Sequence, residues 1–212
     1  TMLLIKLHDT QPSIYDHSIN VAMLTGLFSH EMGFEAAICH ELVIAGLLHD
    51  IGLTTVPKRI MENKGYLSET ETRILQGHVD LGKEVLQAQY KNISDICLSA
   101  ILHHHERLDG TGYPEGLNEE SISFWGKILA ITDSYESITS SRYRRNRRTN
   151  NEAMAVLIKE SGQGYDASLV ALFAQLIGAY PVGSCVLCNR DKEKFLGIVT
   201  KDNKHNPLQP EV

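Results

Sequence analysis

Basic residues are in short supply in this sequence of 212 residues, in which 20 lysines and arginines stand against 26 aspartates and glutamates. The resulting net charge of −6 at pH 7 argues against a general binder of nucleic-acid polymers, because such proteins present a basic face. An anionic ligand would therefore have to be attracted by local positive charge, such as bound metal ions or a cluster of arginines.

Cysteine is also scarce, with only Cys39, Cys97, Cys185 and Cys188 in the chain. So few cysteines do not make the dense disulfide framework of small secreted domains, and we expect a reducing cytoplasm. Cys185 and Cys188 form a C-x-x-C pair, but no second pair lies near them. A zinc site there is the lesser alternative, because structural zinc normally takes four close ligands.

Targeting segments and nucleophile motifs are missing as well. The apolar stretch 2–5 is too short for a signal peptide and is followed by Lys6. We find no apolar run long enough to span a membrane and no G-x-S-x-G motif. Because the chain starts at Thr1 rather than at methionine, we expect it to be part of a longer protein.

What the sequence does contain is mostly helical periodicity. Capping boxes at Ser68-x-x-Glu71 and Thr149-x-x-Glu152 predict the starts of two helices, of which the first runs to about residue 89. Apolar residues spaced three and four apart predict further helices. These cover 14–30, 35–49, 93–104, 121–141 and 167–179.

Glycine and proline mark the breaks between these helices. Residues 51–57 are predicted to form a loop, and 109–114 a turn rich in glycine. Beyond Pro181, two short strands at 184–187 and 195–200 flank a polar turn. We therefore predict an all-α helical bundle over residues 1–180 and a small β-hairpin appendage over residues 181–212.

Four of the ten histidines lie in register with the apolar faces of predicted helices. Each one alone is most simply a core histidine with a single hydrogen-bond partner. Four on successive helices are costly to bury unless each finds a partner, and a shared metal centre would partner all of them at once. These histidines are His17, His49, His78 and His104.

Two aspartates strengthen the case for a metal centre. Asp50 follows His49 at a helix end, and Gly52 permits the turn that both side chains need to reach one centre. Asp133 lies on a helix face of small residues, where the alternative is an exposed or internally bonded carboxylate. A donor set of nitrogen and oxygen favours iron, manganese or zinc in a catalytic site. A bridging Asp50 would suggest two ions about 3.5–4 Å apart.

Two stretches then carry a family resemblance. Residues 49–52, His-Asp-Ile-Gly, resemble the motif that names the HD superfamily of metal-dependent phosphohydrolases. Residues 104–114, His-His-Glu-x-x-Asp-Gly-x-Gly-Tyr-Pro, are similar to the longer motif of its HD-GYP branch. His78 lies between the two motifs and Asp133 follows them. The resemblance covers nearly the whole chain and implies an HD-domain helical bundle.

The resemblance implies a metal-dependent phosphodiesterase that hydrolyses cyclic di-GMP to linear pGpG, and in some members on to GMP, with a hydroxide that bridges two metal ions. Those ions would be iron or manganese, although the same donors accept zinc, nickel or magnesium. Asp50 and His49 would be catalytic. The implied metal ligands are His17, His49, Asp50, His78, His104, His105 and Asp133, and the implied substrate-binding residues are Tyr113, Arg142, Arg145 and Asp109.

The implied partners are cyclic di-GMP or a related cyclic dinucleotide and GGDEF-type domains, and a homodimer is compatible with the family. The implied setting is the cytoplasm of a bacterium, where the domain would be the output of a longer sensor protein.

Three departures from the family pattern qualify this reading. Leu53 stands where the family usually has a lysine that contacts the scissile phosphate, with Lys58 nearby. Ser13 stands where members with a third metal have glutamate, so we expect two ions. Residues 143–144 are Tyr-Arg instead of the usual Pro-Tyr.

Two alternatives to the phosphodiesterase remain open. Leu53 favours a module that binds metal and a cyclic dinucleotide as a sensor or docking domain, without efficient turnover. An HD hydrolase of ordinary nucleotides is the other alternative, although the Gly-Tyr-Pro motif speaks against it.

Overall fold

The computed structural model describes residues 2–63, 65–140, 148–178, 183, 185–190, 193–201, 203 and 211–212. Most of them are helical, as predicted. The helical elements are α1 (Met2–Thr10), α2 (Pro12–Glu31), α3 (Ala36–Leu48), η1 (Ile51–Thr55), α4 (Lys58–Met61), α5 (Glu69–Gln76), α6 (His78–Gln89), α7 (Asp95–His103), α8 (Phe124–Thr139), α9 (Asn150–Lys159) and α10 (Ala167–Ile177).

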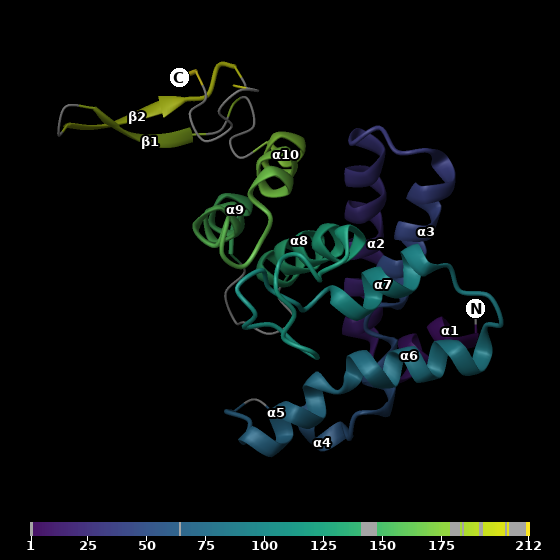
Figure 1. Ribbon diagram of the computed structural model, residues 1–212. Coiled ribbons are helices and arrows are strands. Elements are labelled where there is room, and N and C mark those ends of the chain that lie inside the picture. Colours follow the sequence, from purple (N-terminus) through teal and green to yellow (C-terminus); the bar gives the residue numbers. More distant parts are fainter. Residues whose placement is uncertain are drawn as a thin grey trace.

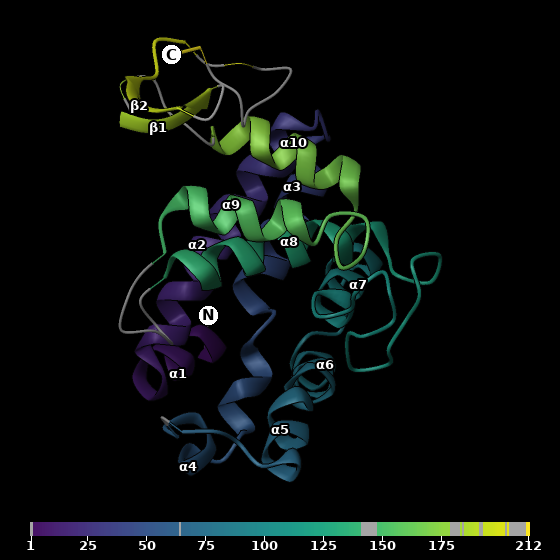
Figure 2. The same cartoon turned by 90° about the vertical axis from the view of Figure 1, so that its left-hand side faces the viewer.

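The centre of the bundle is formed by α2, α3, α7 and α8, which pack against one another, while α9 and α10 cover α8 on one side (Figures 1 and 2). Phe28 of α2 and Phe173 of α10 meet edge to face, with ring centroids 5.1 Å apart. Tyr135 of α8 packs on Phe173 in the same way, at 5.2 Å. This apolar core fixes α2 relative to α8, the two helices that later face each other across the site.

Local chemistry explains the predicted helix starts. Ser68 and Thr149 each accept a hydrogen bond from the backbone N–H three residues on, and Glu71 and Glu152 return the bond to the cap residue. Both capping boxes are thus confirmed. These reciprocal bonds satisfy N–H groups that the first turn of a helix leaves without partners.

The helical elements differ from the prediction in three respects. The predicted loop at 51–57 contains the 3-10 helix η1, and α1 and α4 were not foreseen. The single helix predicted from Ser68 to residue 89 is divided at Gly77, which ends α5 and precedes α6. Gly77 keeps nearly helical dihedrals (φ −61°, ψ −8°), so the apolar periodicity continues across the break and hides it in the sequence.

Strands β1 (Cys185–Arg190) and β2 (Glu193–Ile198) form a two-stranded antiparallel hairpin, which lies beyond α10, far from α4 and α5 (Figures 1 and 2). The two cysteines of the C-x-x-C pair both lie on β1 and are free thiols. Residues three apart on a strand point to opposite faces, so Cys185 and Cys188 cannot both coordinate one ion. The domain boundary at residue 180 stays a prediction.

The prediction about membrane-spanning runs needs a correction. Residues Ala36–Thr55, which comprise α3 and η1, form a 20-residue stretch long and apolar enough to cross a membrane by length and composition. In the structure, 44% of its most apolar window is buried, and α3 packs between α2 and α7. It is a core helix of the bundle, which is why its apolar side chains are so dense.

Candidate metal centre

All seven predicted ligands gather at one place inside the bundle. His17 comes from α2, Asp133 from α8, and the others from helix ends. Burial of the four histidines on apolar faces is confirmed, because His17, His49, His78 and His104 are each at most 2% exposed. The helix ends involved are those of α3 (His49 and Asp50), α6 (His78) and α7 (His104 and His105).

The donor atoms form two groups that share one carboxylate. His17, His49 and Asp50 make one group, and Asp50 with His78, His104 and His105 makes the other, with donors of each group within 4.8 Å of one another. Asp50 Oδ2 lies 3.7 Å from His17 Nε2 and 3.5 Å from His49 Nε2. Asp50 Oδ1 lies 3.3 Å from His78 Nε2. One carboxylate therefore turns one oxygen toward each group, the placement of a bridging ligand.

Asp133 also faces residues of both groups. Its Oδ1 lies 3.1 Å from His17 Nε2 and 3.8 Å from His49 Nε2, and its Oδ2 lies 3.8 Å from His105 Nδ1. Asp50 and Asp133 are each 5% exposed. Two carboxylates buried this deeply are costly without positive charge nearby.

Three of the histidines are oriented by backbone carbonyls three residues earlier. His49 Nδ1 meets the Gly46 carbonyl at 2.8 Å, His78 Nδ1 meets that of Leu75 at 2.7 Å, and His104 Nδ1 meets that of Ile101 at 2.5 Å. A carbonyl accepts but does not donate, so Nδ1 carries the proton in each ring. These carbonyls are available because the last turn of a helix leaves its C=O groups without helical partners.

The opposite ring nitrogens are thereby left as acceptors. The Nε2 atoms of His49, His78 and His104 are buried, and among the described residues they have no hydrogen-bond partner; the His78–Asp50 approach lacks hydrogen-bond geometry. A buried acceptor without a donor is costly, and an outward Nδ1–H bond with an inward Nε2 is the usual arrangement of metal-binding histidine. The cluster is therefore consistent with a metal-binding site.

Burial favours the neutral form of three of the rings, whereas at His78 the Asp50 carboxylate outweighs burial and raises the pKa. Burial lowers the pKa of His104 to about 3, with a further contribution from His49, and it lowers the pKa of His49 despite the nearby aspartates. Burial takes the pKa of His105 well below its usual value. Neutral imidazoles are the form that binds a metal ion.

His17 is held differently. Burial opposes its charged form, but the carboxylates of Asp133 and Glu136 outweigh burial and raise the pKa of His17 to about 9. Its Nδ1 hydrogen-bonds to Glu136 Oε2, and Asn20 Nδ2 donates to Glu136 Oε1 at 3.0 Å. Sequence reasoning missed Glu136 and Asn20. The available signal was their spacing, since each lies one helical turn beyond a predicted ligand, Asp133 or His17.

The Gly-Tyr-Pro segment is organised by a buried carboxylate of the same motif, to which the sequence analysis assigned no role. Glu106 is 2% exposed, and its two oxygens accept the backbone N–H groups of Glu115 at 2.8 Å and Leu117 at 2.9 Å. This loop places the Tyr113 ring 4.5 Å from the His105 ring, centroid to centroid, and 6.3 Å from that of His78. Tyr113 thus lies against the cluster.

A Glu106→Gln variant is expected to lose about 1–3 kcal/mol of stability, because the amide NH₂ would face a backbone N–H that needs an acceptor. Urea unfolding of the metal-free proteins measures this loss. Glu115→Gln is the matched control, since Glu115 is an exposed residue of the same loop and should change stability by less than about 0.5 kcal/mol. Equal effects of the two variants would contradict this role for Glu106.

The remaining predicted residues lie outside the cluster or outside the described residues. Asp109 is exposed and accepts hydrogen bonds from the N–H and hydroxyl of Thr111, at 3.0 and 2.6 Å, so the structure places it in the turn. Its role in substrate binding stays a prediction. Arg142 and Arg145 lie outside the described residues, and their phosphate-binding role stays a prediction too.

Leu53 is 4% exposed and belongs to the apolar core. Lys58 is 75% exposed in its side chain, and its Nζ lies 3.4 Å from Glu62 Oε1. His103, the first of the three consecutive histidines, accepts the Ser123 N–H on Nδ1 at 2.9 Å. These contacts connect none of the three side chains to the cluster.

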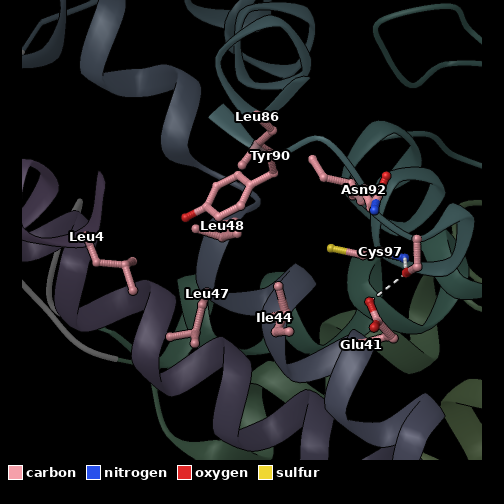
Figure 3. Close-up of a pocket in the computed structure, with 11 residues that line it drawn as sticks. Leu4, Glu41, Ile44, Leu47, Leu48, Leu86, Tyr90, Asn92 and Cys97 are labelled. Carbon is pink, nitrogen blue, oxygen red and sulfur yellow. Dashed lines mark hydrogen bonds between the residues drawn. The ribbon is translucent and has the colours of Figure 1, made fainter. Parts of the chain in front are cut away.

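A hollow of about 310 Å³ lies elsewhere, between α1, α3, α6 and α7. Figure 3 shows its mainly apolar walls, with Cys97 and the Glu41–Ser94 hydrogen bond at one side. None of the candidate ligands lines it, and it carries no paired imidazole and carboxylate groups. The chemistry of the histidine cluster, rather than the size of this hollow, locates the candidate site.

Comparison with known proteins agrees with this geometry. A family model described as "HD domain" matches residues 3–169. The chain is 32% identical over 209 residues to a cyclic di-GMP phosphodiesterase of Pseudomonas aeruginosa, which covers 99% of this chain and 49% of that protein. It is 35% identical over 150 residues to the 3'3'-cGAMP-specific phosphodiesterase 1 of Vibrio cholerae, covering 71% and 34%. The chain thus spans half or less of these relatives' lengths.

A solved structure shares the fold. The HD domain of the L. monocytogenes phosphodiesterase PgpH, in complex with cyclic di-AMP, superposes with a TM-score of 0.61 at 18% identity, covering 84% of this chain and 93% of that one. Its likeness supports the mostly helical bundle. With the family model over most of the chain and the two motifs at the cluster, the chain belongs to the HD domain family, in its HD-GYP branch.

Proposed function

We propose that this domain is a metal-dependent phosphodiesterase that hydrolyses cyclic di-GMP to linear pGpG. The observation that carries the proposal is the pair of donor groups joined by Asp50, with the Nε2 atoms of His49, His78 and His104 turned inward. Such a pair suits two divalent ions. Relatives named as phosphodiesterases of cyclic di-GMP and of 3'3'-cGAMP support the substrate class.

The residues would divide the work as follows. The ions, when bound, would supply an activated water and offset the charge that develops on the phosphate. Asp50 and Asp133 would hold both ion positions, since each faces both donor groups. Tyr113, beside His105, would offer a ring against which a nucleobase can stack. Arg142 and Arg145 would hold the non-reacting phosphate, because guanidinium groups suit phosphate oxygens.

A second candidate function rests on Leu53. This side chain is buried in the core, so it offers no charge to a phosphate. Lys58 is near in sequence, but its ammonium group faces Glu62. The second candidate is therefore a domain that binds metal and a cyclic dinucleotide without efficient turnover.

One experiment separates these functions. Protein purified without oxygen would be stripped of metal, reloaded with Mn²⁺ or Fe²⁺, and its metal content measured. It would then be incubated with cyclic di-GMP, 3'3'-cGAMP, cyclic di-AMP and linear pGpG, and the products would be separated by chromatography. We expect cleavage of cyclic di-GMP. Bound metal with no cleavage of any substrate would overturn the enzyme proposal, and tight cyclic di-GMP binding in that case would support the second candidate.

Metal removal should also lower stability. A ligand that binds only the folded state stabilises it by about 2.7 kcal/mol at a concentration 100-fold above its Kd, which for a chain of this size is roughly 5–10 °C in Tm. Thermal unfolding with EDTA and with Mn²⁺ measures this shift. An identical Tm in the two conditions would argue against a metal site in the folded protein.

A further inference from the structure

We infer that Glu136 is a positioning residue of the metal centre, which holds His17 so that its Nε2 faces the ions. This inference rests on the proposed metal-dependent function and assigns Glu136 and Asn20 a part in it. Neither residue is among the ligands that the family resemblance implies.

The geometry is a clamp between two helices. Asp133 and Glu136 lie one turn apart on α8, and they take opposite edges of one imidazole: Asp133 Oδ1 lies 3.1 Å from His17 Nε2, and Glu136 Oε2 bonds to His17 Nδ1. On α2, Asn20 lies one turn beyond His17 and donates to the other oxygen of Glu136 at 3.0 Å. Glu136 is 6% exposed and His17 2%, so water does not compete freely for the bond between these two side chains.

His17 requires a side-chain acceptor for its Nδ1 because of its position in α2. The other three buried histidines lie at helix ends, where Nδ1 bonds to a backbone carbonyl three residues earlier. His17 is the sixth residue of the 20-residue helix α2. There the preceding carbonyls accept N–H groups of the helix itself, so a side chain from another helix has to serve as the acceptor.

A carboxylate in this position has a defined effect. It accepts only, so it keeps a proton on Nδ1. A metal ion would then displace the second proton of the ring, on Nε2 beside Asp133 Oδ1, and take the Nε2 lone pair. A carboxylate partner on Nδ1 also makes Nε2 a more basic ligand for a metal ion than a carbonyl partner would. A glutamine could present its NH₂ group instead, which would favour the tautomer with the proton on Nε2.

The test measures metal affinity and needs no turnover. Metal-free wild type and a Glu136→Gln variant would be titrated with Mn²⁺ in competition with a chromophoric chelator. We expect the variant to bind about 10–100-fold more weakly, the usual loss when the partner of a metal-binding histidine is removed. Glu41→Gln is the matched control, because Glu41 is a half-buried carboxylate that accepts a hydrogen bond from the Ser94 hydroxyl away from the metal centre. The Mn²⁺ affinity of this variant should equal that of the wild type.

A double-mutant cycle shows whether Glu136 acts through His17. If it does, Glu136→Gln causes no further loss of affinity in a His17→Ala background. Equal losses in both backgrounds would mean a general structural role and would overturn the inference. Asn20→Ala serves if Glu136→Gln does not fold, since Asn20 is an exposed residue, and it should weaken Mn²⁺ binding in the same direction by a smaller factor.

The outcomes separate this inference from the proposed function. Wild-type affinity in both Glu136→Gln and Asn20→Ala would overturn the inference alone. The inference is supported if Glu136→Gln weakens Mn²⁺ binding in the otherwise wild-type protein but causes no further loss in the His17→Ala background. This holds even if the wild type cleaves no cyclic dinucleotide. A wild type that takes up no divalent ion would overturn both.

Discussion

An Asp50→Asn variant is expected to lose metal-dependent hydrolysis by at least about 10²–10³-fold, the loss seen when one pre-organised electrostatic group is removed from an active site. Asp50 is the carboxylate common to both donor groups. An amide is neutral and has one acceptor oxygen instead of two, so it cannot face both groups as the carboxylate does. The Mn²⁺-induced rise in Tm should shrink in the same variant. Chromatography of the products and thermal unfolding measure the two effects.

The control for this variant is Asp9→Asn. The Asp9 carboxylate is 68% exposed and pairs with His8 at 3.2 Å, so the loss of its charge should leave turnover unchanged. Full activity in Asp50→Asn, with metal content equal to that of the wild type, would refute the bridging role.

A Gly52→Ala variant is expected to be destabilised by at least about 3 kcal/mol, the upper end of ordinary overpacking, and to lose Mn²⁺ affinity as well. A Cβ at Gly52 would lie 1.9 Å from the His78 carbonyl oxygen and 2.6 Å from the Gly82 nitrogen. Both atoms are backbone, so η1 and α6 must separate. Because His78 begins α6, this shift moves a candidate ligand. Urea unfolding and Mn²⁺ titration provide the measurements.

Gly82→Ala is the matched control on the other side of the same contact. A Cβ at Gly82 would lie 3.5 Å from the Gly52 nitrogen and 3.7 Å from Ile51 Cγ2, at ordinary contact distance. Alanine in a helix interior is favoured over glycine by about 0.5–1 kcal/mol, so this variant should be as stable as the wild type or more so. Comparable destabilisation of both variants would show that the close approach at Gly52 is not the cause.

The sequence indicates that Gly52 matters but gives only part of the reason why position 52 requires glycine. In the sequence it is the residue that permits a turn after Asp50. In the structure it is not among the glycines with positive φ, so it needs no special backbone conformation. The requirement for glycine comes from the closeness of α6, and the identity of that neighbour is a tertiary fact.

The candidate ligands could be predicted from the sequence because helical periodicity depends only on residues close together in the chain. His17, His49, His78 and His104 each lie on the apolar face of a helix, and that placement predicts burial without knowledge of the fold. The structure confirms the burial of all four. The division of the helix at Gly77 could not be predicted, because the apolar periodicity continues through the break without a change.

The sequence by itself determined the helical class, the capping boxes, the buried histidines and the two motifs that identify the family, since all of these depend on residues close together in the chain. Only the tertiary structure decided which oxygen of Asp50 faces which histidine, and that Glu136 bonds to His17. Those contacts join residues 28 to 119 positions apart, and periodicity along a helix contains no information about which other helix will lie against it.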